Sequence, residues 1–301
     1  MLVSSIEYHD MRRRRMEETE MEQAIQIVTD SSCDLPQRLV ERLKIAVVPL
    51  IVRFGAEVYR DGELSADEFW EKAAGPHHPQ TSQPSVGTFE EIFERLVAQG
   101  KRVLCLTITG KHSGTFNAAR LAAQRFGEAV KVFDSHSLSL GLGLQALAAA
   151  QAARAGRSMQ EILALLEDMR TRMHLVIVLD TLENLRRGGR ADGFIAVVDR
   201  MARALNIKVI INLVEGQLRL IGAARSFRGA LKRVMSQIEQ LGTLEHLAVV
   251  HTRAQEVAEE VADRLAERIG FPRERIWVRE TGAVLATHAG AGVIGVLAVP
   301  R

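Results

Sequence analysis

Three short stretches of this chain place hydroxyl or imidazole groups where a ligand could meet them. Thr81-Ser82-Gln83-Pro84-Ser85 is a polar loop stiffened by proline, Ser113-Gly114-Thr115 stands between a predicted strand and a predicted helix, and Thr287-His288 precedes two glycines. A helix start offers unpaired N–H groups and a partial positive charge, to which a hydroxyl adds a donor. Helix capping explains each hydroxyl stretch singly. Together they predict a neutral pocket for a carboxylate or phosphate, and a histidine in a glycine-rich bend can approach a ligand closely.

Ser113 is also a candidate nucleophile, with His112 or His288 as its base, in a hydrolase or phosphotransferase. The stretch Gly110-Lys-His-Ser113-Gly114 has one residue too many before the serine to match a nucleophile elbow. A catalytic pair needs its base within about 2.6–3.2 Å of the hydroxyl. The distance between these side chains therefore separates a binding site from a catalytic one.

Motifs for nucleotides and metals fail on their context. Gly290-Ala-Gly292-Val-Ile-Gly295 matches the dinucleotide pattern, but the six residues that follow cannot form a βαβ unit. The looser match at Gly141-x-Gly143-x-x-Ala146 falls inside a predicted helix. No pair of histidines, or of glutamate and histidine, has the helical spacing of a metal site. We therefore expect no cofactor and no metal.

Composition narrows the class of protein. The 301 residues suggest two domains of ordinary size, and 47% hydrophobic content indicates a folded protein. A net charge of +2, an aromatic content of 5% and the lack of a helix-turn-helix pattern argue against a nucleic-acid partner. No apolar run approaches ~18 residues, so at most transient membrane contact is expected. Two unpaired cysteines, Cys33 and Cys105, favour a cytoplasmic protein.

The first half of the chain alternates strands and helices. Strands are predicted at 25–29, 45–52, 103–109 and 130–133, and helices after Pro36, after the capping boxes Ser65-x-x-Glu68, Thr88-x-x-Glu91 and Ser158-x-x-Glu161, after Thr115, and over 138–155. The nearly all-apolar run at 45–52 indicates a strand buried on both faces. This alternation is typical of an α/β domain with a parallel sheet, whose strand ends build its sites.

The second half differs from residue 173 onward. A hairpin is predicted at 208–214 and 218–222 around Glu215-Gly216, with further strands at 247–251, 276–279 and 293–299 and helices at 194–205, 229–241 and 254–269. We therefore expect an α/β domain over 24–172, an α+β domain with a mixed sheet over 173–301, and a flexible N-terminal extension over 1–23.

Arginines gather near the end of one predicted helix. Leu185-Arg186-Arg187-Gly188-Gly189-Arg190 is an ordinary helix C-terminus or an arginine surface for an acidic partner. Arg225 and Arg228 could extend such a surface.

Taken in order, these stretches resemble the DegV family of bacterial fatty-acid-binding proteins from about Ile25 to Val299. Each motif is weak alone, whereas the ordered set is highly specific. The landmarks are Ile27-Val-Thr-Asp30-Ser31, Val48-Pro49-Leu50, Tyr59-Arg60-Asp61-Gly62, Thr81-Ser-Gln-Pro-Ser85, Ser113-Gly-Thr115, Asp134-Ser135 leading to Ser139-Leu-Gly-Leu-Gly143, Asp180-Thr181-Leu182-Glu183, Gly188-Gly-Arg190 and Thr287-His288.

The resemblance implies a two-domain fold with a lipid tunnel between or within the domains. It implies one bound long-chain fatty acid, such as a C16 or C18 acid, whose carboxyl group meets Thr81 and Ser113 with His288 nearby. Ser82, Gly114, Thr115 and Thr287 would surround that site.

The resemblance also implies that the protein has no catalytic activity of its own. Many family members present the acid to a separate ATP-dependent kinase subunit that makes an acyl phosphate, and Arg190 and Arg225 match the arginines at that contact. The chain departs from the family at Thr109-Gly-Lys-His112, where a serine-rich stretch is usual, at Phe227, where a second arginine is frequent, and at Gly282-Ala283, where Gly-Pro is usual.

Overall fold

A parallel sheet of four strands forms the first layer of the molecule. The structure, a computed structural model, describes residues 24–179, 181, 183–189 and 207–301. The strands are ordered β2-β1-β6-β7 and all run parallel. They span Ile25–Asp30 (β1), Ala46–Val48 (β2), Arg102–Thr107 (β6) and Val130–Asp134 (β7). Helices cover both faces, as a buried parallel sheet requires.

Serine hydroxyls cap three of the six helices described in this half. The six helices span Gln37–Leu43 (α2), Ala66–Ala73 (α3), Val86–Ala98 (α4), Thr115–Ala123 (α5), Leu140–Arg154 (α6) and Met159–Arg172 (α7), with 3-10 turns at Ser31–Cys33 (η1) and Gln124–Ala129 (η2). Ser65 and Ser158 form the predicted capping boxes of α3 and α7. The box predicted at Thr88 is wrong, because Ser85 caps α4 by accepting from the Thr88 N–H at 3.0 Å.

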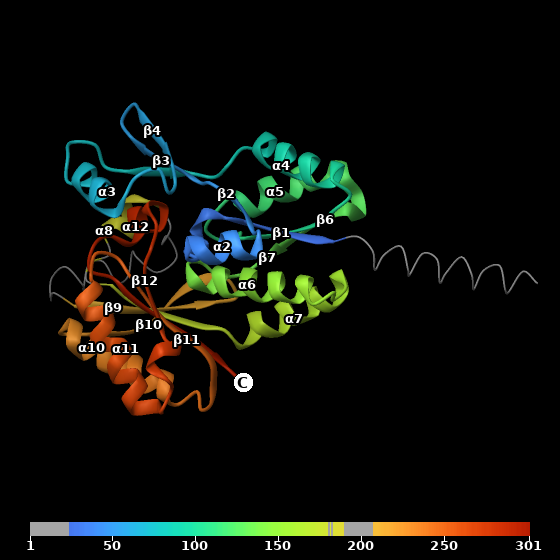
Figure 1. Ribbon diagram of the computed structural model, residues 1–301. Coiled ribbons are helices and arrows are strands. Elements are labelled where there is room, and N and C mark those ends of the chain that lie inside the picture. The colour runs from blue at the N-terminus through green and yellow to red at the C-terminus, as the bar shows by residue number, and fades with distance from the viewer. Residues whose placement is uncertain (1–23, 180, 182, 190–206) are drawn as a thin grey trace, which may run out of the picture.

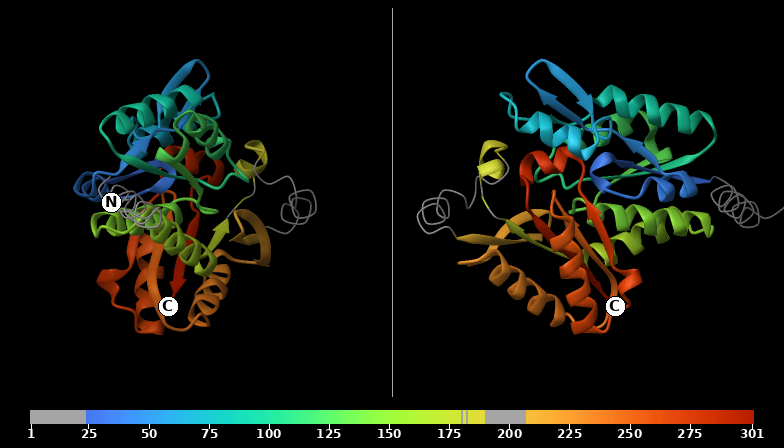
Figure 2. Two further views of the ribbon diagram at one scale, coloured as in Figure 1. Left: turned by 90° about the vertical axis from the view of Figure 1, so that its right-hand side faces the viewer. Right: turned by 60° about the vertical axis from the view of Figure 1, so that its left-hand side comes forward.

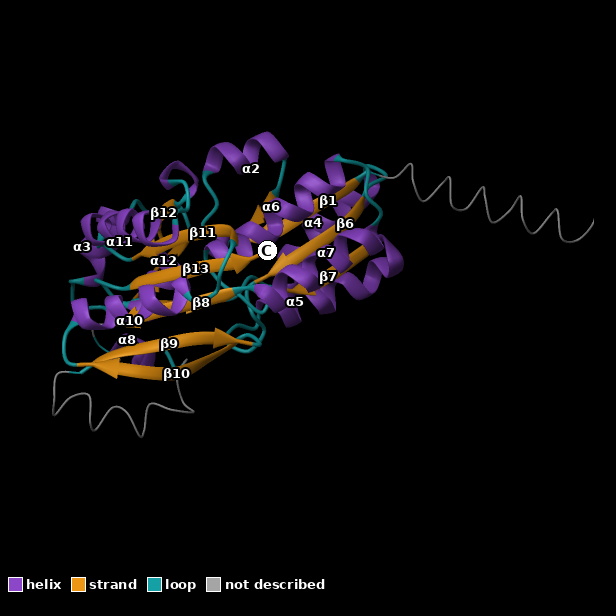
Figure 3. Ribbon diagram, turned by 90° about the horizontal axis from the view of Figure 1, so that it is seen from below, coloured by secondary structure: helices purple, strands orange, loops and turns teal. Residues whose placement is uncertain are grey.

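A mixed sheet of six strands forms the second half. Its order is β10-β9-β8-β13-β11-β12, and only the pair β11–β12 is parallel (Figure 3). The strands span His174–Leu179 (β8), Lys208–Val214 (β9), Gln217–Ala224 (β10), Leu244–His251 (β11), Trp277–Glu280 (β12) and Ile294–Pro300 (β13). The helices span Glu183–Arg187 (α8), Phe227–Glu239 (α10), Gln255–Ile269 (α11) and Ala283–Ala289 (α12), with a 3-10 turn at Arg273–Arg275 (η3). The hairpin around Glu215-Gly216 is confirmed, and the helix predicted at 194–205 lies outside the described residues.

The single strand predicted at 45–52 is wrong. Pro49, which has no N–H to donate to a sheet, separates β2 from a second strand, Ile51–Phe54 (β3). That strand joins Glu57–Arg60 (β4) and Gln80–Ser82 (β5) in a small antiparallel sheet ordered β4-β3-β5. The small sheet and α3 share an apolar cluster with α12, so a segment near the C-terminus packs on the N-terminal half (Figure 2).

The two large sheets lie on opposite sides of α6 and α7 (Figure 1). The largest apolar cluster contains residues of both helices, of β1 and β6 above them, and of β8, β11 and β13 below them. Helices α4 and α5 cover the outer face of the parallel sheet, and α10 and α11 cover that of the mixed sheet. The architecture is therefore an α/β parallel sheet followed by an α+β mixed sheet, while the boundary at residue 172 stays a prediction.

Candidate functional site

A largely apolar cavity lies where the two halves meet. The empty space among its lining residues is about 960 Å³ when the open solvent at the mouth is included. None of the described residues that line it is Lys, Arg, Asp or Glu. The lining consists of Leu50, Thr81, Ser82, Gln83, Ile108, His112, Ser113, Leu138, Ser139, Ile177, Leu179, Leu185, Ile211, Leu218, Val250, His251, Thr252, Thr281, Val284, Leu285, His288, Ala289, Val293 and Gly295.

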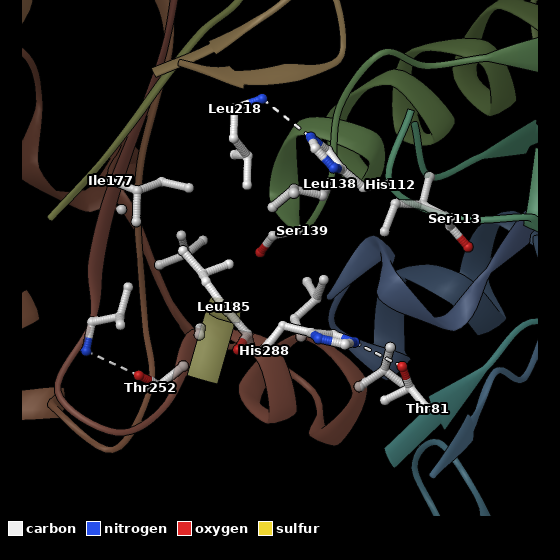
Figure 4. A pocket seen from close by; sticks show the side chains of 18 of the residues that line it. Thr81, His112, Ser113, Leu138, Ser139, Ile177, Leu185, Leu218, Thr252 and His288 are labelled. Carbon is white, nitrogen blue, oxygen red and sulfur yellow. Dashed lines mark hydrogen bonds between the residues drawn. The ribbon is translucent and has the colours of Figure 1, made fainter. Parts of the chain in front are cut away.

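Thr81 and His288 meet at one end of this cavity. Thr81 lies in β5, His288 lies in the last turn of α12, and the Thr81 Oγ1 to His288 Nε2 distance is 2.7 Å (Figure 4). The glycine-rich bend predicted for Thr287-His288 is therefore wrong in form, since these residues are helical. Thr287 is buried and donates its hydroxyl to the Ala283 carbonyl at 2.8 Å, so it faces its own helix.

Ser113 reaches the same cavity from the loop before α5. Its Oγ lies 2.8 Å from Thr115 Oγ1 and accepts from the Thr115 N–H at 3.3 Å. The loop that carries Thr81 touches the Ser113 loop, since a Cβ built on Gly114 would lie 2.7 Å from Gln83 Cδ. The structure thus brings Thr81, Ser113 and His288 to one cavity, with Ser82 also in its lining.

His112 holds the β9–β10 hairpin against the N-terminal half. Its Nε2 accepts from the Leu218 N–H at 3.1 Å, so that nitrogen carries no proton. Beside it, Thr109 donates its hydroxyl to the Gly216 carbonyl at 3.0 Å. The departure from the family at residues 109–112 therefore coincides with a contact between the two halves, and the hydroxyl paired with a histidine is that of Thr81 and not of Ser113.

The short helix α8 closes a further side of the site. Leu185 is buried and lines the cavity. Gly188 follows the helix and lies against the imidazole, because a Cβ there would be 2.2 Å from His288 Nδ1. The predicted helix end at Gly188-Gly189 is confirmed, and it has a consequence that the capping pattern does not reveal: the missing side chain leaves room for His288.

Ser139 belongs to the site as well, although no local pattern in the sequence predicts a role for it. This residue is fully buried, lines the cavity, donates its hydroxyl to Asp34, and has φ 52° and ψ −140°. Non-glycine residues with such backbone angles cluster at functional sites. In the sequence, Ser139 stands just after Asp134-Ser135, before a long helix, as the first residue of the family landmark Ser139-Leu-Gly-Leu-Gly143.

The structure describes only one of the two arginines expected at a partner contact, and that residue lies apart from the cavity. Arg225 is exposed between β10 and α10 and is absent from the cavity lining. Arg190 lies outside the described residues. Within the described ranges, no group of three His, Cys, Asp or Glu side chains could hold a metal ion. Among those same residues, no helix has the length and apolar character needed to cross a bilayer.

Comparison with known proteins identifies the family. The chain is 37% identical over 282 residues to a DegV domain-containing protein of Deinococcus radiodurans, covering 92% of this chain and 99% of that one. A DegV family protein from Thermus thermophilus, described by its fatty-acid binding, superposes with a TM-score of 0.82 at 33% identity, covering 93% and 100% of the two chains. A stearic-acid-binding protein from Eubacterium ventriosum gives 0.81 at 25% identity, covering 92% and 98%. The DegV family of uncharacterised proteins matches residues 24–301, and this chain belongs to it.

Proposed function

We propose that this protein binds one long-chain fatty acid of the C16 or C18 class in the cavity, with the carboxylate at Thr81, Ser113 and His288. The observation that carries the proposal is the distribution of polarity in the cavity. Thr81 and His288 meet at one end of the cavity and Ser113 lines it from the neighbouring loop, while aliphatic side chains such as Ile177 lie across from them (Figure 4). An apolar chamber with a few convergent polar groups suits a ligand with one polar end.

The hydrogen bonds at the site support a carboxylate as that polar end. If His288 Nε2–H donates to Thr81 Oγ1, the Thr81 hydroxyl proton is left to donate into the cavity. If Thr115 donates to Ser113 Oγ, the Ser113 hydroxyl proton is released in the same way. A carboxylate only accepts hydrogen bonds, so it selects this arrangement of donors.

Burial of the acyl chain supplies most of the affinity. Transfer of each CH₂ from water to an apolar site contributes about 0.8 kcal/mol, so a C16 chain releases roughly 10 kcal/mol before the costs of binding are subtracted. Neutral hydroxyl donors are then sufficient at the head group. The protein in this proposal is a carrier, because Ser113 pairs with Thr115 rather than with a histidine base.

The proposal extends to a partner. As in many family members, the acid would be presented to a separate ATP-dependent kinase subunit that forms the acyl phosphate. Arg190 and the exposed Arg225 would contribute to that contact. This step is tested by mixing the loaded protein with a fatty-acid kinase subunit and measuring the acyl phosphate formed from ATP. R225A should lower the amount of acyl phosphate without loss of bound lipid.

The site is tested by T81A/S113A, with T81S as the matched control that keeps a hydroxyl. Native mass spectrometry of the purified protein, followed by extraction of the lipid, should give one added C14–C18 fatty acid in wild type and T81S. We expect the double variant to remain folded and to lose most of that mass. Undiminished fatty-acid affinity in T81A/S113A would contradict the head-group assignment. Wild type that neither carries nor takes up a fatty acid would contradict lipid binding itself.

A further inference from the structure

Two carboxylates from the N-terminal half meet the start of α12. Asp34 Oδ1 accepts from the Gly282 N–H at 2.9 Å, and Asp61 Oδ1 accepts from the Val284 N–H at 3.3 Å. The first N–H groups of a helix have no partner within the helix, and the residue at the N-cap position, Gly282, has no side chain to supply one. The caps of α12 therefore come from residues 248 and 223 positions earlier in the chain.

The second oxygen of each carboxylate binds within the N-terminal half. Asp34 Oδ2 accepts from the hydroxyl of Ser139, which lines the cavity, and Asp61 Oδ2 accepts from the Ser31 hydroxyl at 2.7 Å. Asp34 itself has φ 50°, a conformation that costs energy for a residue with a Cβ. Each carboxylate is therefore a bridge between α12 and a segment of the N-terminal half.

The helix held in this way carries the imidazole of the proposed head-group site. α12 has seven residues, and two turns contain few internal hydrogen bonds to resist a shift. Val284, Leu285 and His288 all line the cavity from it. A rotation or slide of α12 would change the 2.7 Å distance between His288 Nε2 and Thr81 Oγ1.

We infer that Asp34 and Asp61 are positioning residues that anchor the N-terminus of α12 and thereby set His288 against Thr81. The effect of this anchoring on fatty-acid affinity rests on the proposed function, whereas its effect on the position of the His288 imidazole does not depend on any ligand. Neither carboxylate belongs to the cavity lining, so each acts on His288 through α12, and Asp34 also holds the lining residue Ser139.

The two carboxylates lie among other titratable groups, where they serve as hydrogen-bond acceptors for the start of α12. Asp34 and Asp61 face each other, Arg279 of β12 and the Cys33 thiol face Asp34, and burial raises the pKa of Asp34 to about 7. Burial likewise raises the pKa of Asp61. Neutral isosteres would remove the cost of burying charge, so the test must separate the loss of charge from the loss of the acceptor.

The variants D34A, D34N and D34A/D61A make that separation. The Asn side chain keeps an oxygen for the Gly282 N–H, and its amide can donate to Ser139 Oγ. The measured quantity is the chemical shift of the His288 ring in fatty-acid-free protein, followed by ¹⁵N and ¹H–¹³C NMR over pH. The variant H288Q assigns the signals. L166A, which opens a cavity in α7 outside the lining residues, is the control for lowered stability alone.

We expect the chemical shifts of the His288 ring to move in D34A and further in D34A/D61A, and to stay close to wild type in D34N and L166A. Affinity for palmitate should fall at least tenfold in D34A and less than about threefold in D34N. Unchanged His288 signals in D34A/D61A, or an equal change in L166A, would overturn the positioning role. If wild type binds no fatty acid, a displaced imidazole in D34A would still support the role of Asp34 while the proposed function fails.

Discussion

The hydroxyl–imidazole pair shows what could and could not be predicted at the scale of single residues. Thr81 and Ser113 were identifiable because each stands in a short polar stretch that contains proline or glycine and precedes a predicted helix. The direct contact between Thr81 and His288 was not predictable from spacing, because these residues are 207 positions apart. Ser139 and Asp34 were missed for the same reason, since their hydrogen bond spans 105 positions.

The first prediction concerns Gly188. A Cβ at this position would lie 2.2 Å from His288 Nδ1, and Gly188 does not have a positive φ, so alanine changes the contact without backbone strain. We expect G188A to displace the imidazole and to weaken fatty-acid binding on the order of tenfold, or about 1.4 kcal/mol. Displacement of a fluorescent fatty acid measures the affinity.

The matched control is G87A in α4, where a Cβ would make an ordinary contact of 3.7 Å. That variant should bind as wild type does and unfold at slightly higher denaturant, because alanine favours helix over glycine. Equal affinities of G188A and G87A would show that the imidazole does not need its place beside Gly188.

Asp30 yields a prediction for the pH dependence of stability. The side chain is buried, its carboxylate accepts from the Ile108 N–H at 2.7 Å, and burial raises its pKa from 3.8 to about 6. The folded protein therefore binds this proton more tightly than the unfolded chain. The stability from this group is complete below about pH 4 and is lost as pH rises through 6, by up to about 1.4 kcal/mol per pH unit.

The variant D30N removes this titration. Its amide places a donor among the N–H and hydroxyl groups that face Asp30, so it should be less stable than wild type at every pH. The difference in the free energy of unfolding between wild type and D30N should narrow between pH 4 and 7. Urea unfolding at a series of pH values measures this difference. A difference that stays constant or widens would mean that Asp30 does not take up its proton on folding.

At the scale of elements, the patterns that predicted structure correctly are ones whose stabilising contacts are local, although at the start of α4 a local pattern named the wrong cap. The capping boxes of α3 and α7 and the β9–β10 turn depend on neighbours within a few residues. The residues of α12 resemble a glycine-rich bend in the sequence because the caps of this helix, Asp34 and Asp61, are distant in sequence. The apolar run at 45–52 predicts one strand because its apolar character is continuous, although Pro49 divides it between two sheets.

The start of α4 provides a test of one local pattern. Two hydroxyls three residues apart, Ser85 and Thr88, each precede a helical run, and the structure selects Ser85 as the cap. S85A should lower the free energy of unfolding by about 1 kcal/mol, whereas T88A should cost clearly less. Urea unfolding of both variants decides the order, and a larger loss in T88A would restore Thr88 as the cap.

At the scale of the whole molecule, the cavity depends on contacts between the two halves. The N-terminal half supplies Thr81 and Ser113, and the C-terminal half supplies His288 and the aliphatic wall around Ile177. The β9–β10 hairpin completes that wall with Leu218, and its turn is held by the Thr109 hydroxyl on the Gly216 carbonyl. If the cavity binds an acyl chain as proposed, release of that chain requires part of this enclosure to open, so the weakest contact between the halves should govern the dissociation rate.

The hairpin contact is the element that we expect to control release. Gly216 has φ +77°, and a Cβ there would lie 2.3 Å from Thr109 Oγ1, so G216A should lift the turn from the loop. T109V removes the same hydrogen bond at constant side-chain size and leaves the turn intact, while G222A, with an ordinary contact of 3.8 Å, is the control on the same hairpin. Fatty acid should dissociate severalfold faster from G216A and T109V than from wild type or G222A, as followed by transfer to excess albumin. Wild-type rates in both variants would place the opening elsewhere, and a faster rate in G216A alone would assign the effect to the turn rather than to its contact with Thr109.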